Sequence, residues 1–392
     1  MIDYLEVSSE KNRDNRFTKE DVLSVSGEYG IVNQIEFQGR SFAGASVSNY
    51  GVVENGDVVY TKSPLKSNPY GIIKTNKGIP GIVSTLYAVY KPKEITDSKF
   101  VQIYFELDSR MNSYMHPLVN KGAKNDMKVS AENALKGMVS FPKKDEQEMI
   151  SLYFSTIDHL ITLHQRKCEQ TKKLKKYMLQ KMFPQNGAKV PEIRFYGFTY
   201  DWEQRKLSEI TTMHARIGWQ NLRTSEFLDS GDYMLITGTD FNDGAINYST
   251  CHFVERERYE QDKHIQIKNG SILITKDGTL GKVAYVQGLS MPATLNAGVF
   301  NVEIKDETEV NDKYLFQYLK APFLMDYVNK KATGGTIKHL NQNILVDFPV
   351  FMPSKAEQEE IGTYFEKLDN LITLHQRQTD FYKKISFYYI SS

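Results

Sequence analysis

The chain has 392 residues, of which 40% are hydrophobic and 25% charged, and its formal net charge at pH 7 is +1. This length exceeds one ordinary hydrophobic core and predicts two or three domains. Two cysteines, Cys168 and Cys251, exclude a disulfide framework, and the N-terminal stretch is not a signal peptide. A run of about 18 apolar residues, which a membrane span requires, does not occur, so we expect a cytoplasmic protein without a membrane partner.

Residues 1–145 are expected to form a sheet-rich globular domain. The stretch ENGDVVYTK (54–62) predicts a turn at Asn-Gly followed by a β-branched strand. Two polar loops follow, TKSPLKSNPYGIIK (61–74) and NKGAKNDMKVSAEN (120–133). Lysines favour phosphates and asparagine can pair with adenine, so both loops are candidate DNA contacts, with ordinary surface loops as the alternative. The candidate residues are Lys62, Ser63, Lys66, Lys74, Lys121, Lys124, Asn125 and Lys128.

Residues 146–183 are expected to form a long helix, roughly 55 Å at about 1.5 Å per residue. Its apolar positions recur three and four residues apart, as one narrow stripe that requires a second helix as partner. The stripe consists of Ile150, Tyr153, Ile157, Leu160, His164, Thr171, Leu174 and Met178. Four lysines, Lys172, Lys173, Lys175 and Lys176, are expected on the solvent side, as a solvated face or as contacts to a partner or a DNA backbone.

Residues 184–200 are a connector broken by Pro184, Gly187 and Pro191. A second globular domain, residues 201–356, contains KNGSILITK (268–276), which repeats ENGDVVYTK at a shift of 214. Its polar loops are KDGTLGK (276–282) and NKKATGGTIKHLNQN (329–343). The candidate DNA contacts here are Lys276, Asp277, Thr279, Lys282, Thr333, Gly334, Gly335, Thr336, Lys338 and Asn341.

Residues 357–392 repeat the first long helix at a shift of 211: DHLITLHQR (158–166) becomes DNLITLHQR (369–377). The expected stripe is Ile361, Tyr364, Leu368, Leu371, His375, Gln378, Tyr382, Ile385 and Tyr389. The two helices are therefore expected to pack against each other, with their histidines in the contact between them. The polar loops differ between the two halves of the chain, whereas the long helices are nearly the same. Two similar domains with different loops suit an asymmetric target of two parts.

Motifs for catalysis are incomplete. SNPYG (67–71) lacks the second proline of an amino-methyltransferase loop, and KDGTLGK lacks the remaining residues of a phosphate loop. No cysteine or histidine cluster has metal-ligand spacing, so we predict neither a catalytic residue nor a metal site. Glu303 and Lys305 resemble the last piece of a nuclease motif, so the alternative function is a DNA-binding subunit with nuclease activity. A third hypothesis is a coiled-coil adaptor that does not bind nucleic acid.

The repeated EQ…I…YF…D.LITLHQR, KKLKKYMLQKMFP (172–184) and GFTYDWEQRKLSEI (197–210) resemble the specificity subunit of Type I restriction-modification systems. GDVVYTK, GSILITKDGTLGKV and ATGGTIKHLNQN add to this resemblance, which extends over the whole chain. It implies an α+β fold of two pseudo-repeated target-recognition domains joined by two long antiparallel coiled-coil helices. Each domain would read half of a bipartite double-stranded DNA site, and the helices would set the spacer.

The same resemblance implies partners and cofactors. Two methyltransferase subunits would dock on the helices and bring S-adenosylmethionine, and restriction subunits would bring ATP and Mg, so this chain itself holds no cofactor. Two departures concern the ends. The Asp-Trp lead-in at residues 201–202 has no counterpart before the first domain, and the second helix lacks the final MFP. We expect either a sequence trimmed at its ends or a second lead-in that serves alone.

Overall fold

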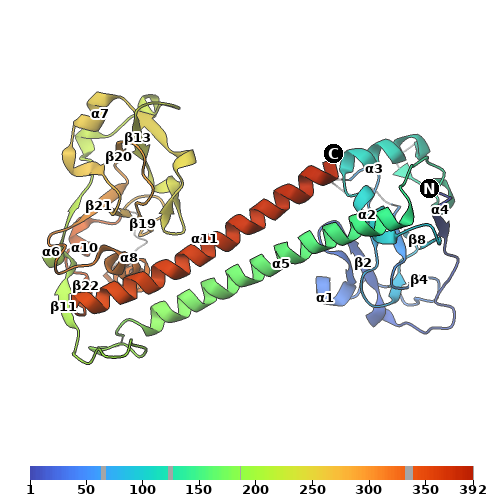
Figure 1. The fold of residues 1–392 in the computed structure, drawn as a ribbon, viewed down its shortest axis with the longest axis horizontal. Coiled ribbons are helices and arrows are strands. Elements are labelled where there is room, and N and C mark those ends of the chain that lie inside the picture. The colour runs from blue at the N-terminus through green and yellow to red at the C-terminus, as the bar shows by residue number, and fades with distance from the viewer. Residues whose placement is uncertain (63–67, 122–126, 186, 332–338, 392) are drawn as a thin grey trace. The chain divides into compact units, whose positions relative to one another are not determined.

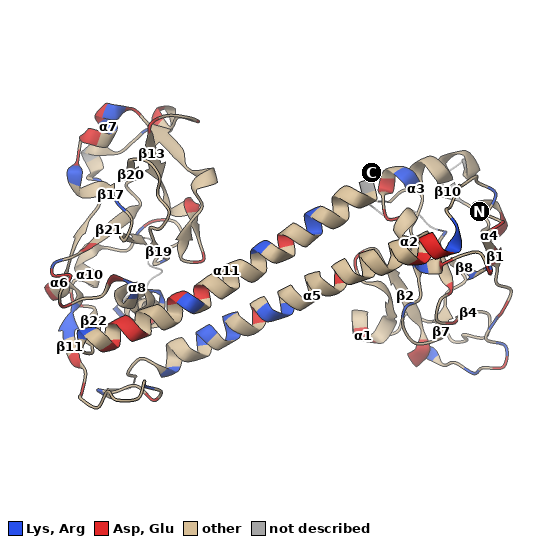
Figure 2. Cartoon of the chain, viewed as in Figure 1, with Lys and Arg blue, Asp and Glu red and all other residues tan. Residues whose placement is uncertain are grey.

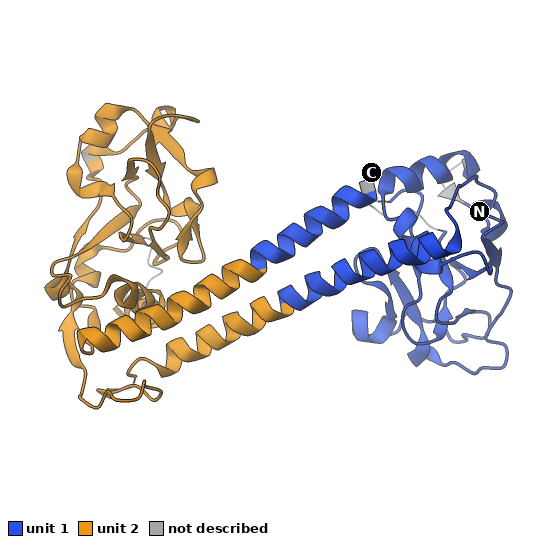
Figure 3. Ribbon diagram, viewed as in Figure 1, with its two compact units in different colours: residues 1–165, 376–392 blue, residues 166–375 orange. Residues whose placement is uncertain are grey.

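The computed structural model describes residues 1–62, 68–121, 127–185, 187–331 and 339–391. The chain divides into two compact units, Met1–Gln165 with Gln376–Ser392 and Arg166–His375 (Figure 3). Two helices, α5 (Lys144–Lys181) and α11 (Lys355–Ser391), each contribute residues to both units (Figure 1). Among the described residues, no helix is both long enough and apolar enough to span a lipid bilayer.

The first unit is built on a four-stranded antiparallel sheet in the order β1-β8-β5-β6. These strands are β1 (Leu5–Val7), β8 (Tyr87–Pro92), β5 (Val58–Thr61) and β6 (Ile73–Thr75). The shorter pairs are β2 (Leu23–Ser26) with β3 (Gly30–Asn33), β4 (Gly51–Val53) with β7 (Gly81–Val83), and β9 (Asn120–Lys121) with β10 (Met127–Lys128). The helices are α1 (Gln34–Gln38), α2 (Ser98–Tyr104), α3 (Asp108–Met115) and α4 (Ala131–Ala134). Met111, Met115 and Tyr90 are buried in the core between this sheet and the helices.

The second unit repeats this sheet in the order β12-β21-β18-β19. Its strands are β12 (Thr211–His214), β21 (Val299–Ile304), β18 (Ile272–Thr275) and β19 (Val283–Tyr285). A second sheet contains β16 (His252–Val254), β13 (Tyr233–Ile236), β20 (Ala293–Leu295) and β17 (Gln266–Ile267), with β13 parallel to β20. The remaining pairs are β11 (Glu203–Lys206) with β22 (Pro349–Met352) and β14 (Phe241–Asn242) with β15 (Ala245–Ile246).

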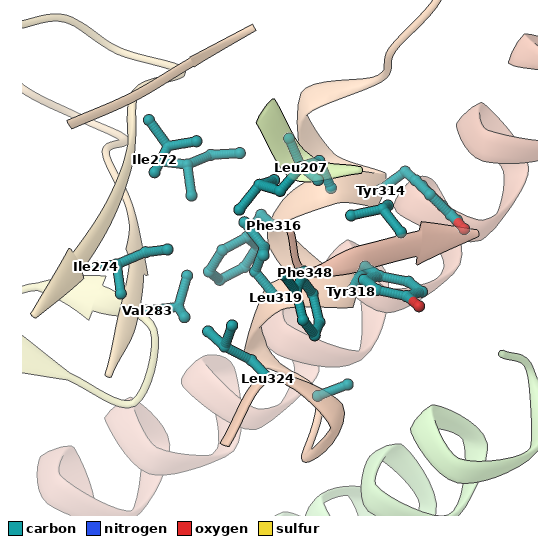
Figure 4. Close-up of a cluster of buried hydrophobic side chains, with 14 of the residues drawn as sticks. Leu207, Ile272, Ile274, Val283, Tyr314, Phe316, Tyr318, Leu319, Leu324 and Phe348 are labelled. Carbon is teal, nitrogen blue, oxygen red and sulfur yellow. The ribbon is translucent and has the colours of Figure 1, made fainter. Parts of the chain in front are cut away.

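Five helices complete the second unit. They are α6 (Leu207–Ile210), α7 (Arg256–Glu260), α8 (Asp312–Lys320), α9 (Phe323–Lys331) and α10 (Gln342–Leu345). Figure 4 shows the core between the first sheet and these helices, where Ile274 and Val283 face Leu319 and Leu324. Helices α8 and α9 pack several large apolar side chains against the sheet. This packing holds the end of β18, where the loop begins, in place relative to the two helices.

The predicted Asn-Gly turns have the same geometry in both units. Gly56 and Gly270 precede β5 and β18 with φ of +90° and +93°, a backbone conformation that favours glycine. The turns close in the same way, since Asp57 N donates to Glu54 O and Ser271 N donates to Lys268 O. The internal repeat seen in the sequence is therefore a repeat of backbone structure.

A buried glutamine fastens each domain to its long helix. The amide of Gln147 accepts a hydrogen bond from Asp97 N (3.0 Å) and donates to Ile95 O (3.1 Å) and Pro142 O (2.8 Å). Gln358 makes the same set, accepting from Asn311 N (2.8 Å) and donating to Glu309 O and Pro353 O (3.0 Å each). We call this three-bond arrangement the glutamine clamp.

Helices α5 and α11 pack in antiparallel orientation within each unit. In the first unit the ring of His164 stacks on the ring of Tyr382, with the ring centroids 5.8 Å apart. The ring of Tyr153 contacts that of Tyr389 edge to face. In the second unit Cys168 lies against the Ile372 carbonyl. Residue numbers rise along one helix as they fall along the other, so the predicted antiparallel helix pair and α+β fold are confirmed.

The predicted seam was partly wrong. Phe365 and Ile372 are buried where Tyr364 and Leu371 were expected, and the side chain of Leu371 is 43% exposed. In α5, Phe154 is buried, whereas Tyr153 is 45% exposed but still contacts Tyr389 of α11, as expected for a seam residue. Each error falls on two adjacent large apolar residues, and periodicity alone cannot decide which of such a pair faces the partner helix.

The prediction that Lys175 lies on the solvent side was also wrong, because the structure buries this residue. Its ammonium lies 2.6 and 2.7 Å from the two carboxylate oxygens of Asp369 on α11. Gln317 of α8 donates to the same carboxylate at 2.8 Å. Burial is the main reason that the pKa of Lys175 falls to about 8. This ion pair links the two long helices in the second unit.

Candidate nucleic-acid interface

Two of the polar loops predicted for the second domain lie side by side. Leu340 N donates to Lys276 O at 2.8 Å, and His339 Nδ1 lies 2.5 Å from Asp277 Oδ1. Residues 276–282 and 339–341 therefore form one surface, which we call the paired-loop surface. Of the predicted residues it contains Lys276, Asp277, Thr279, Lys282 and Asn341.

The loop after β18 is held tightly by its own backbone. Lys282 N donates to Thr275 Oγ1 at 2.9 Å, and Gly281 N donates to Thr275 O at 2.9 Å. Gly281 has φ of +70°, and a Cβ added there would lie 2.0 Å from the sulfur of Met325. Glycine is thus required at this position both for the backbone conformation and for the close approach of α9.

Exposure divides the predicted residues of this loop into two groups. Thr279 and Lys282 are exposed to solvent and free to meet a phosphate or a base edge. Lys276 is half-buried, with its ammonium 5.5 Å from the centre of the Phe300 ring, and Asp277 is engaged by His339. Lys276 and Asp277 therefore support the loop, whereas Thr279 and Lys282 face outward.

The second loop contributes less of its predicted set to the described structure. Asn341 is exposed and precedes α10 as its N-cap residue. Thr333, Gly334, Gly335, Thr336 and Lys338 lie outside the described residues. His339 was not among the predicted residues, although it lies in the quoted segment. No charge or glycine pattern distinguishes it, and only the fold brings it to Asp277.

In the first domain the structure separates the predicted residues. Lys62 is half-buried directly after β5, and burial lowers the pKa of its ammonium. The side chain of Lys74 is 6% exposed and bonds both carboxylate oxygens of Glu106, at 2.7 and 2.9 Å. Because its charge is already paired inside the domain, we leave Lys74 out of the interface.

The other candidates of this domain are only partly described. Lys121 and Lys128 belong to the pair β9–β10, of which the structure gives the backbone alone. Ser63, Lys66, Lys124 and Asn125 lie outside the described residues. The frame around the first of these loops nevertheless matches the second domain, because Thr61 Oγ1 accepts a hydrogen bond from Ile72 N (2.8 Å) as Thr275 does from Lys282.

The residues of the nuclease hypothesis do not converge. Lys305 Nζ donates to Ser208 O at 2.5 Å, whereas Glu303 Oε2 lies 3.8 Å from His214 Nε2. A metal-dependent nuclease would need the lysine and a second acid beside that carboxylate. Figure 2 shows that charges of both signs are spread along α5 and α11, so the helices do not form a uniformly basic surface.

Comparison with known proteins defines the class to which this architecture belongs. Residues 200–380 match the family model described as the Type I restriction modification DNA specificity domain. The MjaVIII specificity subunit of Methanocaldococcus jannaschii is 23% identical over 80% of this chain and 73% of its own length. The MjaIX specificity subunit of the same organism is 27% identical over 47% of this chain and 42% of its own length.

A solved structure shows the same fold. The S subunit of a Type I restriction-modification system from M. genitalium aligns with 99% of this chain and 93% of its own, with a TM-score of 0.59 at 15% identity. The class is thus that of proteins with a DNA specificity domain. The chain belongs to the specificity subunits of Type I restriction-modification systems and is a non-catalytic DNA specificity subunit.

Proposed function

We propose that this specificity subunit reads a bipartite, asymmetric site on double-stranded DNA, one half-site with each globular domain. The proposal rests on a contrast between parts of the fold that are the same in both units and loops that differ. The glutamine clamp and the sheet order are the same in both units, while the loops that follow β5 and β18 differ in sequence. Two similar frames with different loops suit two different half-sites separated by a spacer.

In the second domain, the paired-loop surface is proposed to contact the DNA. Lys282 would hold a phosphate, and Thr279 and Asn341 would reach a base edge or a phosphate oxygen, because all three are exposed on neighbouring segments. In the first domain, Lys62 with Lys121 and Lys128 is proposed for the corresponding role. The residues outside the described ranges remain part of the proposal on sequence grounds alone.

The long helices are proposed to dock two methyltransferase subunits, which restriction subunits then join. Apolar side chains exposed on the helices support this proposal. In the first unit Met149, Leu152 and Phe381 are 65%, 69% and 59% exposed, and in the second Leu374 is 48% exposed. Large apolar groups on a helix surface favour contact with another protein over contact with water.

Chemistry is proposed to reside in the partners, so that S-adenosylmethionine would bind the methyltransferase subunits and ATP with Mg the restriction subunits. The proposed domain map is 1–145 and 201–356 for the readers, 146–183 and 357–392 for the helices, and 184–200 for the connector. We propose a cytoplasmic location, where such a complex meets DNA.

The decisive experiment is single-molecule sequencing of methylated adenines in cells that express this chain with its methyltransferase partner. The expected result is one motif with two different half-sites and a fixed gap. A matched strain expresses the methyltransferase alone and should show no such motif. Methylation at a single undivided site, or at two identical half-sites, would contradict the proposal.

A further inference from the structure

Outside the paired-loop surface, the second unit holds a cluster of metal-ligating side chains. His214, His264 and Glu303 each offer one ligand atom, and these three atoms lie within 4.8 Å of one another. Two imidazoles with one carboxylate form a ligand set typical of zinc and other first-row divalent ions. The residues are far apart in the sequence, so the fold alone assembles the cluster.

The sheet register places two of the ligands on one face. In the pairing of β12 with β21, His214 lies opposite Asn301 and Thr212 lies opposite Glu303. The intervening pair, Met213 and Val302, is buried in the core on the other face. Because side chains alternate along a strand, His214 and Glu303 both point away from that core. Their nearest ligand atoms are 3.8 Å apart.

The third ligand comes from the turn before β17, which belongs to the other sheet of this unit. The rings of His214 and His264 stack with centroids 4.5 Å apart and an interplanar angle of 22°. In an occupied tetrahedral site, metal–ligand bonds of about 2.0–2.1 Å place ligand atoms about 3.3 Å apart. All three side chains are accessible to solvent, so we expect side-chain rotations to bring the three atoms to that separation when an ion binds.

A buried asparagine supports the ligands from below. Asn301, which is 1% exposed, donates from Nδ2 to the backbone oxygen of His264 and to Glu303 Oε1, both at 3.1 Å. Its Oδ1 is buried and has no hydrogen-bond partner among the described residues. Metal-binding histidines generally donate their second ring N–H to an acceptor. Asn301 lies opposite His214 in the sheet and bonds the backbone of His264, so its unpartnered Oδ1 is the acceptor that we assign to a ligand histidine.

We propose that His214, His264 and Glu303 bind one divalent transition-metal ion, with zinc as the occupant, and that Asn301 positions the ligands. The ion joins β12 and β21 of the first sheet to the turn that begins β17 of the second. It therefore staples the two sheets of the second domain together. Three protein ligands leave one position for water.

The test uses the full chain, freed of metal and titrated with Zn²⁺ by calorimetry in the absence of DNA. We expect one equivalent to bind, with at least tenfold weaker binding in each of His214→Ala, His264→Ala and Glu303→Gln. His252→Ala, a histidine of the same unit outside the cluster, is the matched control and should bind as the original chain does. Equal binding by the three variants and the original chain would overturn the proposal.

A second measurement separates loss of a ligand from loss of the fold. With a chelator present, the three variants should melt at the Tm of the original chain. Zn²⁺ at about 100 times its Kd should raise the Tm of the original chain and of His252→Ala by about 5 °C or more. Co²⁺ should give visible absorption bands of a low-coordinate site in these two proteins only. No Tm rise and no such bands in the original chain would overturn the proposal.

Discussion

The two units share one frame but join their long helices differently. In the second unit Asp369 binds the buried Lys175 and accepts from Gln317, so a charged network links α5, α11 and α8. In the first unit the repeat places Asp158 at the position of Asp369, but the position of Lys175 is taken by Ser386, which carries no charge. The clamps, which hold a domain to its helix, are thus the same in both copies. The contacts between the helices have diverged.

Replacing one domain tests the independence of the two units and has the largest expected effect. When residues 3–142 are exchanged for another recognition domain, one half-site should change completely while the other half-site and the gap stay the same. Methylome sequencing reads both at once. If both half-sites changed, the domains would not read DNA independently.

Removing the shared aspartate should affect the two units unequally. Asp369→Ala leaves the ammonium of Lys175 buried without its partner, so we expect a loss of about 2–4 kcal/mol in the free energy of unfolding. Asp158→Ala, the matched control, should change it by less than about 0.5 kcal/mol. Denaturant titration followed by circular dichroism measures both, and similar losses would disprove the asymmetry.

Removing either glutamine clamp should affect the two units equally. Gln147→Leu and Gln358→Leu each leave a backbone N–H and two carbonyls, most of them partly buried, without their hydrogen-bond partners, so each should cost about 1–3 kcal/mol. Hydrogen exchange should show faster exchange only in the domain whose clamp was removed. A loss confined to one of the two variants would show that the second clamp has no matching role.

Raising the pH should stabilise the folded chain, because the buried ammonium of Lys175 in the second unit loses its charge. The pKa of Lys175 is about 8 in the folded chain, below the ordinary lysine value of 10.5, so between these values the unfolded chain binds more protons. The free energy of unfolding should therefore rise with pH, by about 1–2 kcal/mol from pH 8 to 9.5. Lys175→Met should lack this rise, and an equal rise in that variant would assign it to another group.

The smallest effect is expected at the DNA. Lys282→Ala should weaken binding by about 1 kcal/mol for every sequence and reduce the salt dependence by about one counterion. Lys74→Ala in the first domain, whose ammonium is bound by Glu106, should leave the salt dependence unchanged. Fluorescence anisotropy across a salt series compares them, and an equal change in both would contradict the assignment of the exposed lysine.

The sequence predicted the repeat, the two long helices and the loops of the second domain, because each leaves a local pattern. It could not choose between Tyr364 and Phe365 for the seam, since both are apolar and adjacent. It placed Lys175 in solvent because a lysine run is normally solvated, and the partner Asp369 is distant in sequence. It predicted no metal site because His214, His264 and Glu303 lack local ligand spacing and meet only across two strands and a turn.

In both units the strand before the variable loop ends at a threonine, Thr61 in β5 and Thr275 in β18. Thr61 and Thr275 each exchange two hydrogen bonds with the residue that re-enters the sheet, Ile72 or Lys282. In both units the loop is closed at this threonine, although the segment between Thr61 and Ile72 is longer than the segment between Thr275 and Lys282. Insertions and deletions between the two ends cost little loop entropy and leave the strand pairing intact. Mutation can therefore vary these segments with little effect on the sheet, except at fixed positions such as Gly281.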